Sequence, residues 1–146
     1  MSLSGAERDL IRTSFRAMSR SGPTAAGRFY EKLFQEAPET RKLFVNDLEQ
    51  QGRLLMDKLG LIVAQLDNLE GQVPALEDLA LRHVAYGVKP EHYPPFGSAL
   101  LGMLGEILGD DFTPEARAAW SKAYRSLSAL MIRSAYSHGL PRERKF

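Results

Sequence analysis

The sequence predicts an all-α protein, because apolar residues recur at helical spacing over most of the chain and strand patterns are nearly absent. Clusters of Gly, Ser and Pro divide this pattern into six long helices and one short helical turn. A chain of 146 residues suits one domain with a core of useful size. We therefore expect one helical domain.

The first half of the chain contains two helices and the short turn. Ser4 and Glu7 have the spacing of a capping box and begin a helix that ends at the Ser-Arg-Ser-Gly break, 19–22. A second helix is expected over 23–37 and ends before a proline, which disfavours helical geometry in the residue that precedes it. The turn follows over 39–44.

The second half contains four helices. The first is expected over 48–66 and ends at the Asn-Leu-Glu-Gly break, 68–71. The next occupies roughly 74–86, another begins near Pro90, and the last begins at Thr113, which is followed by a proline and a glutamate.

Composition excludes several classes of function. Nineteen basic and 18 acidic side chains give a net charge of +1, so nothing in the total favours binding to nucleic acid or to a membrane surface. The absence of cysteine excludes disulfides, a thiolate nucleophile and Cys-ligated metals. With neither an apolar leader nor a membrane-length apolar run, we expect a soluble cytoplasmic protein. The basic segment 138–146 is expected to be a flexible tail outside a domain at 1–137.

His83 is the most informative residue. It shares a helical stripe with Leu76, Leu79 and Ala80, so its imidazole is expected to point inward. Its helix is expected to end at once, because Gly87 suits a left-handed cap. From the residues alone, His83 is either a core histidine that donates a hydrogen bond to a carbonyl, or a ligand to a buried metal or haem.

Three further residues have an ordinary interpretation when taken singly. Tyr30 lies on an apolar stripe, and taken alone it is interpreted as an amphipathic core tyrosine whose hydroxyl bonds to a carbonyl or to water. Gln51 also lies on an apolar stripe, where it is read as a helix-edge residue in water, and Phe44 as a core anchor at the end of the short turn.

Three motifs point to one family. In the first motif, residues 81–97, a histidine precedes a Gly-Val pair and is followed ten residues later by Tyr-Pro. The second motif, residues 38–44, has the form of a turn that ends in phenylalanine. The third, residues 118–124, has the form of a final helix. From about Ser4 to Ala135, the chain resembles the globins, in particular the single-domain bacterial haemoglobins.

This resemblance implies a globin fold around a buried haem b, with His83 as the proximal ligand of the iron. Tyr30 and Gln51 would lie on the distal side and donate hydrogen bonds to O₂, with Leu55 as an apolar neighbour of the ligand. The other haem contacts that it implies are Phe44, Val88, Tyr93 and Phe96, with Leu55 again in contact on the distal side.

The resemblance implies reversible O₂ binding, as a carrier, buffer or scavenger, with tight binding and slow release. One alternative is a nitric oxide dioxygenase that works with a separate reductase. Another is a haem-based sensor or an interaction module that acts through a partner. CO, NO or sulfide are further possible ligands, and the chain is compatible with an oligomer.

Some positions depart from the family or carry less weight. Ala135 stands where flavohaemoglobins have a glutamate, which argues against peroxidase-like chemistry, and the chain ends about ten residues later, so we expect electrons from a separate reductase. His92 is expected to be an exposed first-turn residue, and His138 to lie at a fraying end. Arg53 and Arg82 are expected to be solvated, with haem propionates as an alternative partner.

Overall fold

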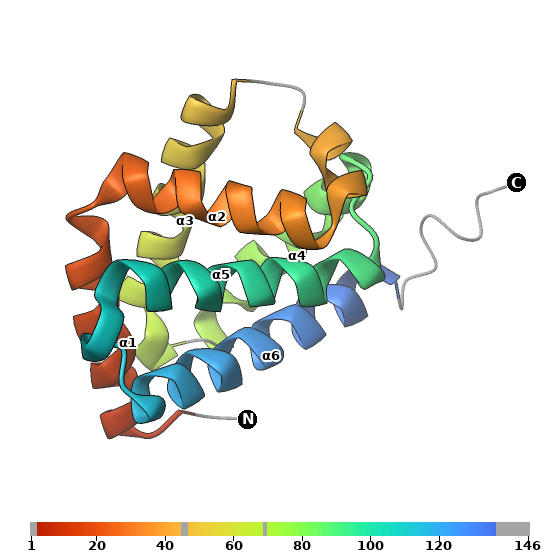
Figure 1. The fold of residues 1–146 in the computed structure, drawn as a ribbon. Helices are drawn as coiled ribbons and strands as arrows, with labels where there is room; N and C mark the ends of the chain where they lie inside the picture. The colour runs from red at the N-terminus through yellow and green to blue at the C-terminus, as the bar shows by residue number, and fades with distance from the viewer. Residues whose placement is uncertain (1–2, 45–46, 69, 137–146) are drawn as a thin grey trace, which may run out of the picture.

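The computed structural model describes residues 3–44, 47–68 and 70–136. Within these ranges the chain forms helices and turns and no strand, which confirms the all-α prediction (Figure 1). The α-helices are α1 (Gly5–Ser19), α2 (Gly22–Glu36), α3 (Leu48–Ala64), α4 (Val73–Ala85), α5 (Tyr93–Leu108) and α6 (Pro114–Tyr136). Short 3₁₀ turns join them: η1 (Pro38–Leu43), η2 (Leu66–Asn68), η3 (Glu70–Gln72), η4 (Pro90–His92) and η5 (Gly109–Asp111).

The predicted capping box begins α1. The Glu7 backbone N–H donates to Ser4 Oγ at 3.1 Å, and the Ser4 N–H donates to Glu7 Oε1 at 2.7 Å. The same glutamate forms an ion pair with Lys122 of α6 at 3.1 Å. The cap therefore fixes both the start of α1 and its position beside α6.

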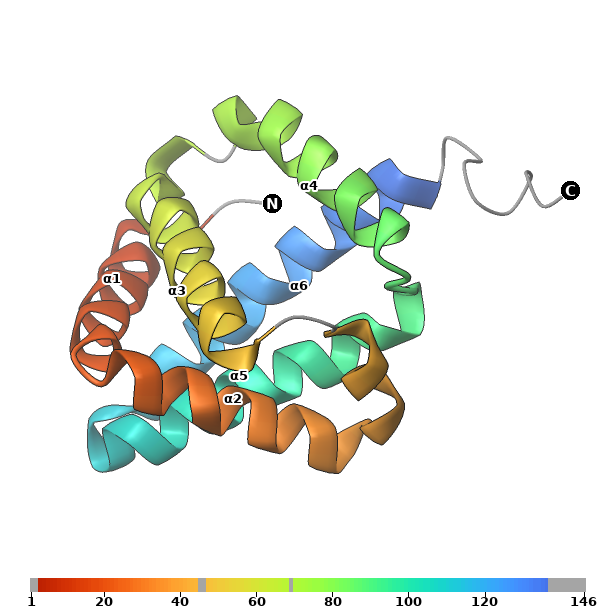
Figure 2. The same ribbon diagram turned by 90° about the horizontal axis from the view of Figure 1, so that it is seen from above.

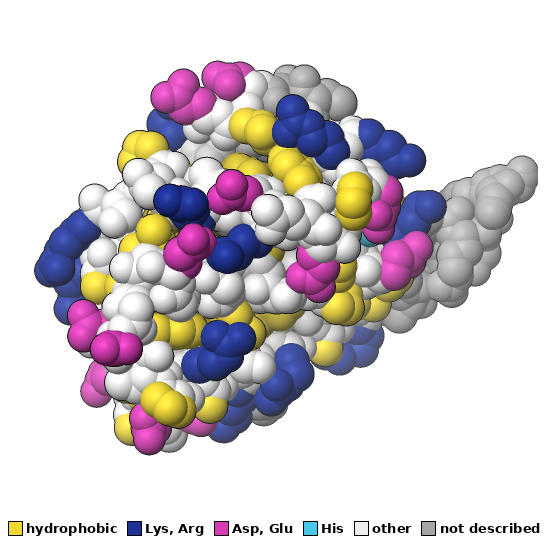
Figure 3. Space-filling view, viewed as in Figure 1, with side chains coloured by type: hydrophobic (Ala, Val, Ile, Leu, Met, Phe, Trp, Pro, Cys, Tyr) yellow, Lys and Arg dark blue, Asp and Glu magenta, His cyan; other side chains and the backbone are white. Residues whose placement is uncertain are grey.

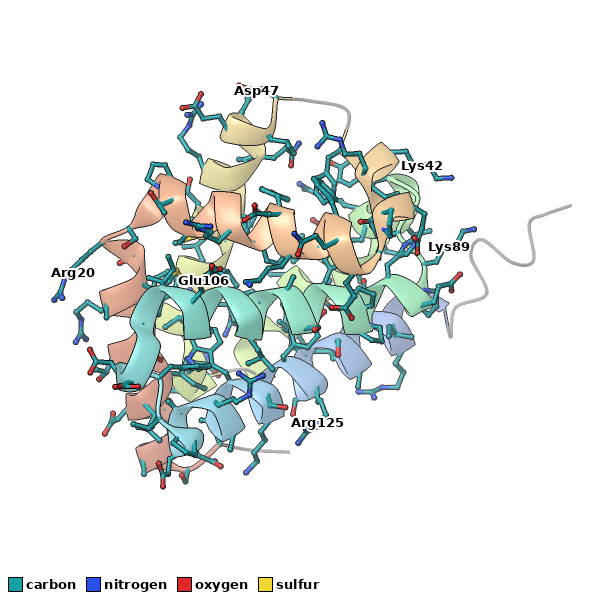
Figure 4. The ribbon with its side chains drawn as sticks, in the orientation of Figure 1. Arg20, Lys42, Asp47, Lys89, Glu106 and Arg125 are labelled. Atoms are coloured by element: carbon teal, nitrogen blue, oxygen red, sulfur yellow. The ribbon has the colours of Figure 1, made fainter. Side chains whose placement is uncertain are left out.

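The helices cross in two groups. In the first, α2 packs against α5 and α3; in the second, α6 packs against α1 and α4. Figure 2 shows α6 passing beneath α3 and α4. Across the α2–α5 contact, Glu106 lies 3.1 Å from Lys32 Nζ and 3.7 Å from Arg28 Nη1 (Figure 4).

The core forms two clusters. The larger one joins α1, α2, α5 and α6, and its fully buried members include Ile11, Met18, Leu33, Met103 and Leu104. The smaller one lies between α4 and α6 and contains Ala80, Val88, Tyr93, Met131 and Ala135.

The start of α5 differs from the prediction. The helix expected near Pro90 begins as a 3₁₀ turn, and α-helix follows from Tyr93. Pro94 and the proline after it lack the N–H that a helix interior requires, so they occupy the first turn, where that donor has no helical partner. His92 is only 8% exposed, and its Nδ1 accepts the Lys89 N–H at 2.9 Å. The expectation of an exposed His92 is therefore wrong.

One face of the molecule carries charged side chains of both signs (Figure 3). Lys and Arg are intermixed with Asp and Glu on the face shown in Figure 3, and hydrophobic side chains show between the start of α3 and η1. No helix among the described residues is both long and apolar enough to cross a membrane. The expected basic tail, 138–146, and His138 lie outside the described residues.

Candidate functional site

His83 lies in the last turn of α4 and is half-buried. Its Nδ1 lies 2.9 Å from the Leu79 carbonyl oxygen, which accepts a hydrogen bond and so fixes the proton on Nδ1. Burial lowers the pKa of His83, against the smaller opposing effect of the Leu79 hydrogen bond, so the imidazole is neutral at pH 7. Among the described residues, Nε2 has no hydrogen-bond partner. This nitrogen keeps a lone pair available for a ligand.

A glycine turn fixes the end of α4 beyond His83. Gly87 has φ +96, the left-handed conformation expected of it. The Val88 N–H donates to the His83 carbonyl and the Gly87 N–H to the Val84 carbonyl, both at 3.0 Å, in the pattern of a Schellman cap. The His83 backbone is thus held by the turn that reverses the chain.

Tyr30 comes from α2 and is 5% exposed. Burial raises the pKa of its hydroxyl to about 12, so the group stays protonated and can donate a hydrogen bond. Among the described residues, nothing forms a hydrogen bond with the Tyr30 oxygen. Every side-chain oxygen or nitrogen in this part of the chain that is fully sealed from solvent does have a partner. The Tyr30 oxygen therefore borders space that a water-sized molecule can reach.

Aromatic rings bring three predicted site residues together. Phe44, which follows η1, meets Tyr30 edge to face with ring centroids 5.2 Å apart. It also stacks on Phe96 of α5 at 6.4 Å. Phe29 and Phe34 of α2 complete the group through contacts with Tyr30 at 5.1 and 6.0 Å.

Gln51 lies in the first turn of α3, which Asp47 caps by accepting the Glu49 N–H at 3.2 Å (Figure 4). Its side chain is half-buried. The next residue, Gly52, packs on α2, so Gln51 lies where α3 crosses the helix that carries Tyr30. No hydrogen bond joins Gln51 to Tyr30.

A cavity of about 620 Å³ lies among α3, α4, α5 and α6. Its walls are mainly apolar, and its volume is within the usual range for small-molecule and cofactor sites. Two predicted haem contacts, Leu55 and Phe96, line it. The other predicted residues do not: His83, Tyr30, Gln51, Phe44, Val88 and Tyr93.

The predicted site is therefore spread over three adjoining regions. Phe96 belongs both to the aromatic group and to the cavity wall, and joins those two regions. Val88 and Tyr93 belong to the smaller core cluster beneath α4, which also holds Ala135. Ala135 thus lies in the same cluster as Tyr93 and is fully buried.

Several cavity residues were not predicted as site residues. They belong to the apolar stripes of their helices, and helical spacing alone cannot separate a cavity wall from ordinary core. They include Leu59, Ile62, Leu76, Leu100, Trp120 and Leu127. A continuation of the Leu55 stripe by one turn identifies Leu59, and this was the available signal.

The two arginines considered as propionate partners lie on the surface. Arg82 forms an ion pair with Asp78 one turn away at 3.0 Å, with both side chains well exposed. Arg53 is exposed. The expectation that Arg82 is solvated agrees with this arrangement.

The globin family profile matches residues 27–131, most of the chain. The chain belongs to the globin family. Flavohemoproteins of Bacillus subtilis and Pseudomonas aeruginosa are each 34% identical to this globin, over 85% and 92% of its length. The matches cover 32% and 35% of those relatives, so the chain spans about a third of their length.

Solved structures agree with the fold. An engineered carbene transferase made from a suggested nitric oxide dioxygenase of Rhodothermus marinus is 30% identical, with a TM-score of 0.82 over 94% of this globin and 96% of that chain. A bacterial globin from Campylobacter jejuni has a TM-score of 0.77 over 92% of this globin and 98% of its own chain. Since that globin is 24% identical, the likeness shows the fold alone.

The residues present fit a haem. A ligating histidine usually donates its other ring N–H to a carbonyl or carboxylate, as His83 does to Leu79. The neutral His83 imidazole suits an iron ligand, and the cavity beside Leu55 and Phe96 has the apolar walls that a haem contacts, although neither His83 nor Tyr30 lines that cavity.

Proposed function

We propose that this globin binds haem b through His83 Nε2 and binds O₂ reversibly on the opposite side, as a carrier, buffer or scavenger. The observation that carries the proposal is the state of His83, a neutral imidazole whose Nδ1–H is engaged by Leu79 and whose Nε2 is unpaired among the described residues. A haem bound there would supply the iron centre at which small gases bind.

Tyr30 and Gln51 are proposed to hold the gas ligand. O₂ gains negative charge when it binds, so donors aimed at it slow its release. The Tyr30 hydroxyl suits this role because burial keeps it protonated and no described residue accepts from it. At roughly 1.5 kcal/mol per hydrogen bond, two such donors slow release by about a hundredfold. CO gains less charge and benefits less.

The apolar residues are proposed to keep water from the site. Phe44, Phe96 and Leu55 provide two aromatic faces and an aliphatic one, none of which offers water a hydrogen bond. Val88 and Tyr93 are proposed to support the proximal side from the cluster beneath α4. Dry walls favour the ferrous state that reversible O₂ binding requires.

Hemin titration tests the cofactor and its ligand. Trp120 is the single tryptophan in the sequence and lines the cavity, so hemin entry is expected to quench its fluorescence as the visible spectrum develops. We expect His83→Ala to weaken hemin binding by about tenfold or more, and added imidazole to restore the spectrum of His83→Gly. His92→Gln is the matched control, since it alters a buried histidine already paired to a backbone N–H. Wild-type hemin affinity and spectrum in His83→Ala would exclude the assignment.

A second proposed function is nitric oxide dioxygenation, in which bound O₂ converts NO to nitrate and a reductase restores ferrous iron. This function is favoured by the suggested nitric oxide dioxygenase activity of the Rhodothermus marinus protein, because the match covers 96% of that chain. Tyr30 and Gln51 would serve both functions. Catalytic NO consumption in the presence of O₂ and a bacterial reductase separates them: sustained turnover indicates the dioxygenase, whereas a single stoichiometric burst indicates an O₂ carrier.

A further inference from the structure

Helices α2 and α3 approach each other very closely where Gly52 faces Ala26. A Cβ built on Gly52 would lie 2.8 Å from Ala26 Cβ and 3.9 Å from Tyr30 Cε2. Non-bonded carbons prefer about 3.5–4.0 Å. Because Ala26 Cβ is attached directly to the backbone of α2, no side-chain rotation relieves the shorter contact. The crossing therefore requires glycine at position 52.

The reason for this glycine is space rather than backbone conformation. Among the described residues only Gly87 and Gly109 have positive φ, so Gly52 has an ordinary right-handed backbone. Glycine in a helix interior is less favourable than alanine. Gly52 lies within α3, where the close crossing alone accounts for it.

The contact lies beside both proposed ligand donors. Tyr30 is one turn beyond Ala26, and residues four apart share a helix face. Gln51 directly precedes Gly52. We propose that Gly52 is a positioning residue that sets the separation of the Tyr30 hydroxyl and the Gln51 amide, and so sets the rate of O₂ release; this inference rests on the proposed function.

Hydrogen-bond geometry makes that rate sensitive to the helix separation. Relief of a 2.8 Å contact to an ordinary one moves the helices apart by about 1 Å. If one of the two donors takes up the whole shift, its distance to the ligand lengthens from near 2.8 Å to near 3.8 Å, beyond the range of a hydrogen bond. Gly52→Ala thus misplaces donors that it does not remove.

The main experiment measures O₂ release from the haem-loaded protein. We expect Gly52→Ala to release O₂ about tenfold faster, as after the loss of one charge-assisted hydrogen bond. Gly60→Ala is the matched control on the same helix, because its new Cβ would lie 3.5 Å from the Phe15 ring, an ordinary contact. Release by Gly60→Ala is expected within about twofold of wild type.

Two double variants separate positioning from general damage. In a Tyr30→Phe background, Gly52→Ala is expected to have a much smaller effect on O₂ release, because the main donor is already absent. Ala26→Gly removes the facing methyl group, so Ala26→Gly/Gly52→Ala is expected to return release toward the wild-type rate. If Gly52→Ala does not fold, Ala26→Val is the alternative variant. It places a larger side chain at the same contact from the α2 side, and it is likewise expected to release O₂ about tenfold faster.

Two measurements need no haem. Urea unfolding of the haem-free chain is expected to show a favourable coupling between Ala26→Gly and Gly52→Ala, and a crystal structure of Gly52→Ala to show α2 and α3 about 1 Å further apart. If Tyr30→Phe speeds O₂ release while Gly52→Ala releases O₂ at the same rate as Gly60→Ala, the inference about Gly52 is overturned and the proposed function stands. If the wild-type protein takes up haem but binds no O₂, both are overturned.

Discussion

The Nε1–H of Trp120 donates to Ser14 Oγ across 2.6 Å, which joins the last helix to the first by a buried hydrogen bond. Ser14 Oγ in turn donates to the Leu10 carbonyl at 2.6 Å, so its single proton is already engaged. Trp120 also lines the cavity among α3, α4, α5 and α6. This hydrogen bond fixes the indole and with it one wall of the proposed haem site.

Removal of the Ser14 hydroxyl is expected to lower stability. Ser14→Ala leaves the Trp120 N–H buried without an acceptor, which costs about 1–3 kcal/mol in the free energy of unfolding. Urea denaturation of the haem-free chain measures the change. Ser128→Ala is the control, because that exposed hydroxyl donates only to Arg125 within its own helix. Equal stability of the two variants contradicts this prediction.

Tyr30→Phe tests the proposed distal donor. Loss of the hydroxyl keeps the ring contacts with Phe29 and Phe44, so the effect on stability is expected to be small. O₂ release is expected to become about tenfold faster or more, with less change for CO, when both are followed by stopped-flow spectroscopy. Tyr86→Phe is the control, since Tyr86 is 67% exposed. A change in O₂ release within about twofold of that control excludes the role.

Asp67 is expected to make stability depend on acid pH. The carboxyl lies 3.1 Å from Arg12 and 2.9 Å from Arg8 of α1, and Arg12 first, then Arg8, hold its pKa below the ordinary value. A depressed carboxyl pKa gives stability that is present above the unfolded-state pKa, near 3.8, and is lost as pH falls through the lower folded-state value.

The matching measurement is urea unfolding of wild type and Asp67→Asn between pH 7 and pH 2. The difference between the two proteins is expected to shrink below about pH 4. Asp110→Asn, which alters an exposed carboxyl outside any described ion pair, is the control. A difference that stays constant across this range would show that the carboxylate charge contributes nothing there.

Tyr124→Phe tests how the start of α5 is held. The Tyr124 hydroxyl donates to the Tyr93 carbonyl at 2.6 Å, and its half-buried ring lies where a Cβ on Gly97 would fall. Burial is the main cause that raises the pKa of Tyr124, so the hydroxyl remains a donor. The variant is expected to lose about 1 kcal/mol of stability, and Gly97→Ala, which overpacks the ring, about 1–3 kcal/mol. Thermal unfolding of both variants provides the measurement.

Sequence patterns predicted much of this fold because its helix boundaries have local causes. The Ser4–Glu7 capping box and the Gly87 turn are formed by neighbours in the chain, and both are present. The start of α5 was misplaced because Pro90 and Pro94 are both acceptable in a first turn, and the choice between them depends on a hydrogen bond from Lys89 to His92.

The candidate site was less accessible to sequence reasoning. An inward direction for His83 follows from its stripe, and the structure adds the Leu79 hydrogen bond that fixes its proton. Trp120 and Leu59 belong to the apolar stripes of their helices, but a cavity is defined by the spacing between helices, which no single stripe records. The requirement for Gly52 is of the same kind, since it depends on Ala26 of another helix.

The glycine turn after α4 also touches the turn that leads to Phe44. A Cβ on Gly87 would lie 3.4 Å from Leu43 Cδ2, so the segments that carry His83 and Phe44, the proposed iron ligand and a proposed haem contact, lie side by side at one edge of the molecule. Lys42 and Lys89, one on each segment, mark that edge in Figure 4. Leu43 packs against the core cluster that contains Val88, so the proposed proximal and distal sides of the pocket share one packed edge instead of being held independently.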